Sequence, residues 1–272
     1  MYINTSKKFL FCSLLLNSVI ALGQTSQTPT YNDSSTLTPL DSIELGGYYA
    51  NLNSGLKDWS GISARLIKHF GQSNVGLFEV EHANRFGENG NLIGASWTHD
   101  FNQEWYGTIG ANFTSHGVFW PNAHYDISIN KKWLESKKLI STLGFQYNDA
   151  RLGYSDRGIL LALSYYFDIP FVLEVGARSN HSNPGSVKTY RGYIAGTYGK
   201  EHERYISLRF DSGREGYQLF GNSQATDFSS QEINFRWKEW WGKEWGTILT
   251  YDVYDNPSYT RKGGSISLFK DF

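Results

Sequence analysis

Charged residues recur at every second position along several short segments of the chain, where they alternate with apolar residues. In QEINFRWKEW (residues 231–240), Glu232 and Arg236 alternate with Ile233 and Trp237. Successive side chains of an extended strand point to opposite faces, so one face of this segment is apolar and the other is charged. Cations and carboxylates on one wet face can bind hydroxyl-rich ligands through charge-assisted hydrogen bonds. Alternatively, they pair with one another across a solvated interior and bind no ligand.

The same alternation in other segments gives a set of candidate lumen or ligand contacts in which both signs are almost equally represented. Mixed rings of charge create a transverse field in a water-filled channel. Three candidates lie in DSGREGY (residues 211–217), where they would contact a ligand or pin the base of a long connection through an internal salt bridge. The candidates are Arg65, Glu79, Glu81, Arg85, Asp126, Glu174, Arg178, Arg209, Asp211, Arg214, Glu215, Glu232 and Arg236, and Arg191, Lys238 and Asp252 share their pattern.

A second set of candidates lies in segments that the sequence predicts to be loops. His116, His124 and His181 have serines close by, and Trp120 follows Phe119 in HGVFWPN. A His–Ser pair with a carboxylate could hydrolyse a lipid or acyl ester. The chain has no G-x-S-x-G and no H-E-x-x-H motif, so no residue is assigned as catalytic. Trp120 would stack on a sugar face, fold inward as a constriction or anchor the loop at a membrane interface.

The beginning of the chain indicates export. Lys7 and Lys8 precede an apolar run over 9–20 and a small-x-small cleavage site, which together predict a secretory signal peptide over residues 1–23. The run is shorter than the roughly 20 apolar residues that a spanning helix needs. The single cysteine, Cys12, lies within the run, so the mature chain would hold no disulfide and no thiolate metal site. The sequence also lacks a phosphate loop and a metal-ligating cluster, which predicts no cofactor and no metal.

Composition restricts the class of the remaining chain. With 25 Lys+Arg against 26 Asp+Glu, no basic excess indicates nucleic-acid binding. Aromatic residues make up 16%, and there are 28 Gly but only 6 Pro, which favours an exported β-protein. Residues 24–41 are rich in Ser, Thr and Pro and predict a flexible periplasmic leader. Residues 42–272 keep the alternating pattern throughout and predict one domain.

That domain is predicted to be an all-β, closed, antiparallel up-and-down transmembrane barrel of about 14 strands, within a range of 12 to 16. Every second connection is tight, whereas the alternate ones run longer, which is typical of short periplasmic turns and longer extracellular loops. A secreted β-sandwich is the alternative, but its polar face would not need so many opposite charges. The predicted strands are 43–53, 58–70, 74–84, 91–100, 104–114, 123–133, 138–148, 157–167, 171–179, 188–198, 203–212, 229–238, 245–254 and 262–272.

Aromatic residues mark the expected membrane interface. Trp237, Trp240, Trp241 and Trp245 surround one predicted turn and would form an interfacial girdle. The chain ends on Phe272 of an apolar strand face, which is the feature that outer-membrane assembly machinery reads. Lys270 on the same face departs from this pattern.

Five segments follow one another in a recognisable order along the chain: EHANRFGENG (81–90), FWPN (119–122), RFDSGREGYQ (209–218), FRWKEWWGKEWG (235–246) and the closing DNPSYTRKGGSISLFKDF. Together they resemble the YaiO family of outer-membrane β-barrels. The resemblance covers residues 42 to 272, although each motif is short and degenerate. Related barrels follow tetratricopeptide repeats near glycan-handling genes, which implies a role in envelope polysaccharide traffic. This chain has no such repeats, which weakens that implication.

The sequence therefore predicts a monomeric barrel in the outer membrane of a Gram-negative bacterium, in contact with membrane lipid and lipopolysaccharide. Its mixed-charge lumen would pass or bind a polar solute such as a glycan, with polysaccharide export as the candidate role. One alternative is a hydrolase of lipid or envelope glycan. The other is a structural or surface-binding barrel plugged by its own loops, with 213–228 as the plug.

Overall fold

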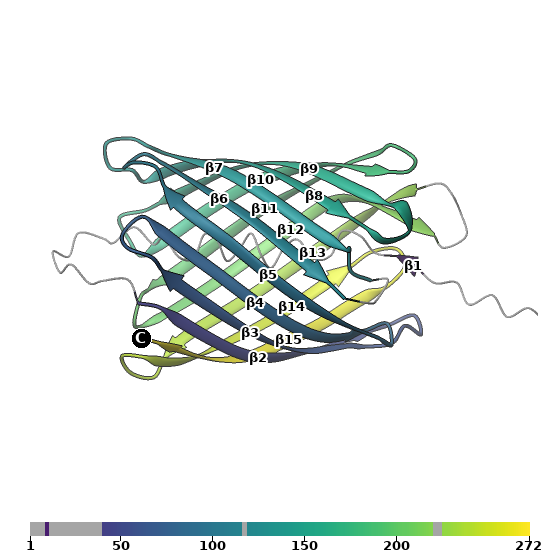
Figure 1. Ribbon diagram of the computed structural model, residues 1–272, viewed down its shortest axis with the longest axis horizontal. Coiled ribbons are helices and arrows are strands. Elements are labelled where there is room, and N and C mark those ends of the chain that lie inside the picture. The colour runs from purple at the N-terminus through teal and green to yellow at the C-terminus, as the bar shows by residue number, and fades with distance from the viewer. Residues whose placement is uncertain (1–8, 11–39, 116–118, 220–224) are drawn as a thin grey trace, which may run out of the picture.

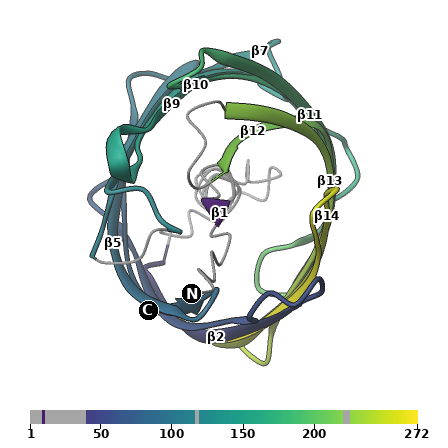
Figure 2. The same ribbon diagram turned by 90° about the vertical axis from the view of Figure 1, so that its right-hand side faces the viewer.

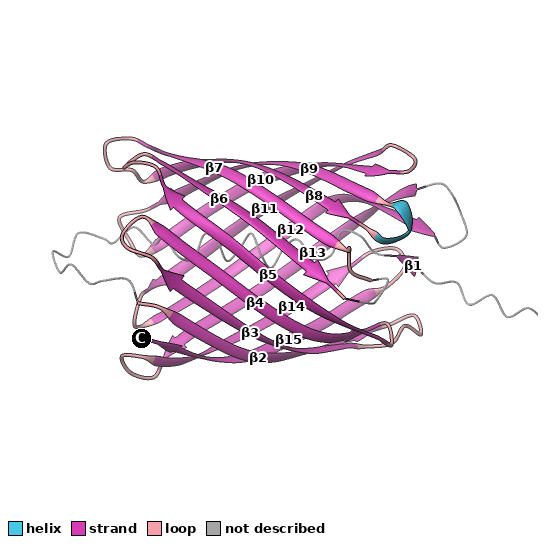
Figure 3. Cartoon of the chain, in the orientation of Figure 1, coloured by secondary structure: helices cyan, strands magenta, loops and turns pink. Residues whose placement is uncertain are grey.

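The computed structural model describes residues 9–10, 40–115, 119–219 and 225–272, and strands dominate them (Figure 3). A short 3₁₀ helix, η1 (Arg151–Gly153), precedes β9. No helix in the described residues is long and apolar enough to cross a membrane. The strands are β1 (Phe9–Leu10), β2 (Ser42–Leu52), β3 (Trp59–His69), β4 (Asn74–Arg85), β5 (Glu88–Asp100), β6 (Trp105–Thr114), β7 (Ala123–Trp133), β8 (Leu139–Asp149), β9 (Ser155–Tyr166), β10 (Phe171–Asn183), β11 (Val187–Lys200), β12 (Arg204–Leu219), β13 (Ala225–Trp240), β14 (Trp245–Asp255) and β15 (Thr260–Asp271).

Strands β2 to β15 form a closed ring, which Figure 2 shows end-on. Each pairs antiparallel with the next strand along the chain, and β15 pairs with β2 to close the ring. The two residues of β1 pair with the end of β12 in addition to this ring. A sheet can cross lipid only when closure leaves no unpaired edge, and the ring meets that requirement. The prediction of a closed up-and-down barrel of 14 strands is confirmed.

The alternation in the sequence separates the two faces of the ring. On β4, Phe78 and Val80 are 41% and 51% exposed, whereas only 14% of the Glu79 side chain between them is exposed. On β13, the exposed residues Ile233 and Trp237 likewise alternate with inward-facing charged ones. Apolar side chains thus form the outer surface that faces lipid, and polar side chains line the lumen.

The ring has two different ends. The end at which the barrel chain begins and finishes is called the terminal end here; it lies at the left of Figure 1, and the opposite end is called the distal end. The first strand of the barrel begins, and the last strand finishes, at this same end, as an even number of strands requires. Most of the distal connections are shorter than the sequence predicts, because the strands continue into the expected loops. Residues 213–218 of β12 pair with 225–230 of β13, so most of the predicted plug over 213–228 is strand.

The predicted tryptophan girdle is confirmed for three of its four members. Trp241 and Trp245 are 66% and 52% exposed at the terminal end, and Trp237 lies on the same outer face. Trp240 differs, because its place in the alternation of β13 turns it inward, where it packs on Ile248 and Phe269. Its indole N–H donates to Asp271 Oδ2 over 2.8 Å. Trp240 is therefore an interior residue.

Lys270 fits the girdle despite its charge. Its ammonium lies 5.3 Å from the ring centroid of Trp245, on the adjacent strand. A lysine at an aromatic belt can keep its stem on apolar surface and its charge at the interface. The lysine thus does not interrupt the lipid-facing surface that Ile266, Leu268 and Phe272 form.

Gly246 of β14 is required for the close packing of this interior cluster. A Cβ atom there would lie 2.0 Å from the Glu239 backbone oxygen and 2.4 Å from the Phe269 ring. We expect Gly246→Ala to lower the free energy of unfolding by about 1–3 kcal/mol, as overpacking does. Gly192→Ala is the matched control, since the nearest atom to its new Cβ is 3.6 Å away. Urea unfolding of both variants in lipid vesicles measures the difference, and equal midpoints would contradict the prediction.

Asp41 joins the barrel seam just before β2. Its carboxylate accepts a hydrogen bond from the backbone N–H of His69 over 2.7 Å and pairs with Lys68. Its own backbone exchanges hydrogen bonds with Phe272 over 3.0 and 2.8 Å. Burial alone would raise the pKa of the Asp41 carboxyl, but the His69 N–H and the Lys68 ammonium lower it overall.

Because the pKa of Asp41 is lower in the folded state, its stabilisation is present above the ordinary value of 3.8 and is lost as pH falls through the folded pKa. We expect Asp41→Asn to reduce the free energy of unfolding by about 1 kcal/mol at neutral pH. The difference from wild type should shrink in acid. Urea midpoints at pH 7 and below pH 3.8 test this, and a difference independent of pH would refute it.

Candidate functional site

Alternating arginines and carboxylates cross the lumen wall formed by β10 to β15. They form one connected network, called the charge ladder below. Contacting members lie on the same strand, on adjacent strands or on strands two apart in the ring, so the network depends on the register of the ring. Its members are Glu174, Arg191, Arg209, Asp211, Glu215, Glu232, Asp252 and Arg261.

Arg191 on β11 is the centre of the charge ladder. One of its terminal nitrogens, Nη2, lies 3.3 Å from Glu232 Oε2, and the other pairs with Glu215. Its Nε lies 4.0 Å from Asp211 Oδ1, and Nη1 also donates to Ser230 Oγ over 2.7 Å. The three carboxylate side chains are at most 4% exposed. A single guanidinium therefore contacts three enclosed carboxylates, two of which it shares with Arg209 and Arg261.

Arg261 on β15 extends the charge ladder toward β14. Its Nη2 lies 3.0 Å from Glu232 Oε1 and 2.8 Å from Asp252 Oδ2. Its Nε also donates to the same Asp252 oxygen over 3.0 Å. Glu232 thus bridges two arginines, Arg191 and Arg261, with one oxygen for each. Such a fixed bridge positions both guanidiniums against the lumen.

Arg209 on β12 forms the other end of the charge ladder. It donates to both oxygens of Asp211 over 2.8 Å, and its guanidinium lies 3.7 Å from the centroid of the Tyr193 ring. Glu174 Oε1 lies 4.0 Å from its Nη1. Three arginines therefore face five carboxylates within the ladder, whereas Arg178, Arg236 and Lys238 add three cations to the same wall.

A smaller ion-pair group lies on the adjoining wall. Arg65 on β3 joins Glu44 on β2 and Glu79 on β4, at 2.9 and 3.3 Å. By contrast, Arg178 and Arg236 form no salt bridge with any residue that the structure describes. Both face inward on β10 and β13. Lys238, inward on β13 as well, likewise has no carboxylate within salt-bridge distance among the described residues and lies over the rings of Trp240 and Phe269.

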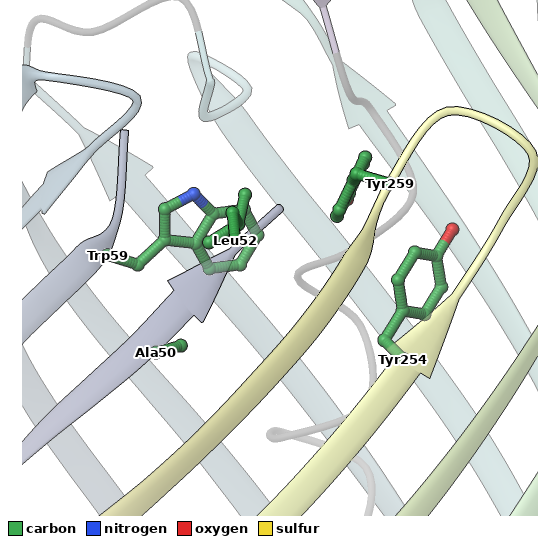
Figure 4. Close-up of a cluster of buried hydrophobic side chains, with 5 residues drawn as sticks. All are labelled: Ala50, Leu52, Trp59, Tyr254 and Tyr259. Atoms are coloured by element: carbon green, nitrogen blue, oxygen red, sulfur yellow. The ribbon is translucent and has the colours of Figure 1, made fainter. Parts of the chain in front are cut away.

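Aromatic rings and arginines gather inside the distal end of the barrel, and we call this group the distal cluster. Arg85 lies 4.9 Å from the ring centroids of both Trp59 and Trp120. The Arg261 guanidinium also lies 4.8 Å from the centroid of the Trp59 ring. Arg261 therefore belongs to both the distal cluster and the charge ladder. Figure 4 shows Trp59, Tyr254 and Tyr259 beside Ala50 and Leu52. The members are Tyr48, Trp59, Arg85, Trp120, Tyr254, Tyr259 and Arg261.

Hydrogen bonds hold Arg85 in place within the distal cluster. Its Nε donates to the Tyr48 hydroxyl over 3.1 Å, and its Nη2 donates to Glu81 Oε1 over 3.2 Å. Trp59 and Trp120 are only 5% and 1% exposed, and neither indole N–H has a hydrogen-bond partner among the described residues. Rings, cations and unsatisfied donors in one place are the groups that bind the faces and hydroxyls of a sugar.

The remaining lumen wall, formed by β5 to β9, is lined mainly by hydroxyl, amide and small side chains. Thr98 and Thr108 share a hydrogen bond of 2.9 Å, and Thr142 donates to Asn130 over 2.6 Å. A hollow of about 60 Å³ lies between these residues and Gln146. The lumen is therefore two-sided, with charges concentrated on one wall and uncharged polar groups on the other.

Two of the three predicted loop histidines lie in strands, and the described residues assemble no catalytic triad around either of them. His124 lies in β7 and is buried; its ring contacts Asn148 over 2.7 Å and Asp126 over 3.4 Å. His181 lies in β10 on the outer face, where it contacts Ser186 over 2.8 Å. In the part of the chain that the structure describes, no carboxylate forms an ion pair with His181. His116 lies outside the described residues.

Arg214 corrects the sequence-based assignment. It was expected beside Asp211 and Glu215, but its side chain is 57% exposed and pairs with Asp227 across the outer face of β12 and β13. Odd-numbered residues of this part of β12 face the lumen, so Arg214 points the other way. Arg214 thus forms its salt bridge outside the lumen, with a residue of β13 and not within the 211–217 segment.

The family of the chain follows from a comparison with known families. The model of the YaiO membrane beta barrel domain matches residues 40–218. The chain belongs to the YaiO family. None of the curated proteins matches the YaiO barrel described here.

Solved structures share the fold of this YaiO barrel at low sequence identity. The CymD monoaromatic hydrocarbon channel superposes with a TM-score of 0.57 at 9% identity, over 87% of this chain and 89% of that one. A bacterial polysaccharide outer membrane secretin gives 0.55 at 11%, over 86% and 98%. OmpT of Vibrio cholerae without its loop L8 gives 0.50 at 9%, over 85% and 98%. The family and the shared fold support an outer-membrane location.

Apart from Arg214, every charged candidate from the sequence faces the lumen of the YaiO barrel. Of the three roles predicted for Trp120, the inward-folded position is the one that the structure shows. Sequence reasoning missed Trp59, Tyr254 and Arg261. A signal existed for each: Trp59 shares its face with Arg65, Tyr254 shares its face with Asp252, and extending the last strand by two residues places Arg261 inward.

Proposed function

We propose that this YaiO barrel is an outer-membrane channel of a Gram-negative bacterium that passes a polar, hydroxyl-rich solute, with an envelope polysaccharide as the candidate cargo. The observation that carries the proposal is the distal cluster, in which Trp59 and Trp120 present rings and unsatisfied N–H donors beside Arg85 and Arg261. Rings bind the apolar face of a sugar, and the guanidiniums bind its hydroxyls.

The two-sided lumen supports the same function. A barrel of this size leaves an interior wider than side chains alone fill, unlike one with eight strands. A sugar chain that leaves the distal cluster would have hydroxyl and amide partners on β5 to β9, and charged partners on the charge ladder. A polysaccharide secretin is among the proteins that share this fold, so the fold is compatible with such a cargo.

The test is single-channel conductance of the protein purified from outer membranes, in planar bilayers. Maltohexaose is the neutral probe and an oligogalacturonate is the acidic probe. We expect steady conductance that maltohexaose interrupts and the acidic probe interrupts less, because the charge ladder carries more carboxylates than arginines. Conductance that neither sugar interrupts would overturn the sugar assignment.

A barrel without conductance would overturn the channel itself and favour the plugged alternative. The inward-packed Trp120 is the described residue that would then close the lumen, since the segment 213–228 is mostly strand. The hydrolase alternative has no assembled catalytic group among the residues that the structure describes, and no observation favours it.

A further inference from the structure

A lysine on the lipid-facing surface is enclosed by two tryptophans. Lys131 on β7 shares the outer face with Ile127 and Ile129, which are 53% and 42% exposed. Its ammonium lies 3.8 Å from the ring centroid of Trp133 and 5.1 Å from that of Trp105. Indole faces attract an ammonium at this distance and hold it at a defined place.

Lys131 differs from the other lysines of the same turn. Lys132 faces Asp100 at 3.7 Å, Lys138 pairs with Asp168, and Lys137 donates to Gln103 Oε1 over 2.9 Å. Among the residues that the structure describes, no carboxylate lies within salt-bridge distance of Lys131. Its charge is therefore oriented by the rings but left without an anion. The three N–H donors of an ammonium cannot be satisfied by two ring faces.

An apolar groove of about 660 Å³ begins at this lysine. It runs over β7, β8, β9 and β10, which lie side by side in the upper part of Figure 1. Small residues, Ser141 and Ala177, lower its floor between larger neighbours. Volumes from roughly 300 to 1,000 Å³ are usual for sites that hold a small molecule. The apolar residues that line it are Ile129, Leu143, Leu161, Leu163, Val175 and Ala177.

The polar end and the apolar length of the groove match the two parts of one lipid. The tryptophans and Lys131 lie at the terminal end of β6 and β7, where aromatic belts mark the head-group level. The leucines extend from there toward the middle of the membrane-facing surface. A phosphate at Lys131 would thus continue into an acyl chain along the groove, within the leaflet at the terminal end.

We propose that this groove binds a single phospholipid, with its phosphodiester on the Lys131 ammonium between Trp105 and Trp133 and one acyl chain on the apolar floor. The charge-assisted hydrogen bond from Lys131 gives the site its preference for phosphate, and the groove requires an acyl chain. This site is separate from the lumen and needs only that the barrel lies in a membrane.

Native mass spectrometry of the delipidated protein in detergent, titrated with dioleoyl phosphatidylglycerol, tests the proposal. We expect one lipid bound at low concentration, and Lys131→Ala should weaken its binding about tenfold, as loss of one charge-assisted hydrogen bond does. Ala177→Trp should weaken binding comparably, because the indole would fill the apolar groove. Lys270→Ala is the matched control and should bind as wild type does, since Lys270 lies on one ring only and outside the groove.

Two outcomes would overturn the site. If Lys131→Ala and Lys270→Ala bind lipid equally, the enclosure by two tryptophans has no specific role. If inorganic phosphate at millimolar concentration displaces the lipid completely, the groove does not contribute and the ligand is not a lipid. Retention of the barrel's heat-modifiable migration on gels shows that each variant is folded.

Discussion

Replacing Arg191 with methionine is expected to lower the free energy of unfolding by about 3 kcal/mol and to make the channel more selective for cations. The reason is that Arg191 compensates Asp211, Glu215 and Glu232, whose side chains are at most 4% exposed. Without the guanidinium, these carboxylates repel one another in an enclosed part of the lumen. The value is at the lower end of the range for broken buried pairs, because water can still reach a channel interior.

Two measurements follow from this expectation. Urea unfolding in lipid vesicles gives the stability change from the midpoint and slope. The reversal potential under a salt gradient gives the selectivity, since removing one fixed cation makes the lumen wall more negative. Arg204→Met is the matched control. The Arg204 side chain is 54% exposed in its pair with Glu239, and exposed pairs contribute about 0–1 kcal/mol. Equal destabilisation by both variants would show that the charge ladder adds nothing beyond a surface pair.

Replacing Trp120 with alanine is expected to raise single-channel conductance severalfold. Trp120 is 1% exposed inside the distal end, where it packs with Phe119 on Ala83 and Leu92 and lies against Arg85. Removal of the indole therefore widens the passage and takes away one of the rings that the Arg85 guanidinium contacts. The barrel should remain folded, because Trp120 belongs to the connection between β6 and β7 and not to the paired strands.

The control for this variant is Trp241→Ala, which removes an indole that is 66% exposed to lipid at the terminal end. Its conductance should equal that of wild type. Trp59→Ala gives an independent check, since Trp59 lies between Arg85 and Arg261 in the same cluster. If neither Trp120→Ala nor Trp59→Ala changes conductance or maltohexaose block, the distal cluster is not on the path of the solute. The proposed function would then lose the observation on which it rests.

Some lumen contacts depended on where a strand ends. The predicted last strand began at residue 262, whereas β15 begins at Thr260 and so includes Arg261. Polar residues such as those of 213–218 resemble a loop in composition, yet they continue the ladder of β12 with β13. Because a strand end is set by pairing with its neighbour, composition alone could not locate it. The continuation of β12 through residues 213–218 also places Arg214 on the outer face of the barrel, whereas the sequence predicted it in the lumen.

The sequence by itself determined the class of the barrel and the face of nearly every strand residue. The period of two is a local property, and only a closed ring leaves no unpaired backbone in lipid. The tertiary structure alone decided which inward residues meet. Arg191 joins Glu232 over 3.3 Å, and Arg65 joins Glu44 over 2.9 Å, through the register of the strands that carry them. Register places Arg85 of β4 beside Trp59 of β3, ring closure adds Arg261 of β15, and the connection between β6 and β7 adds Trp120. None of these contacts is encoded in the alternation of a single strand.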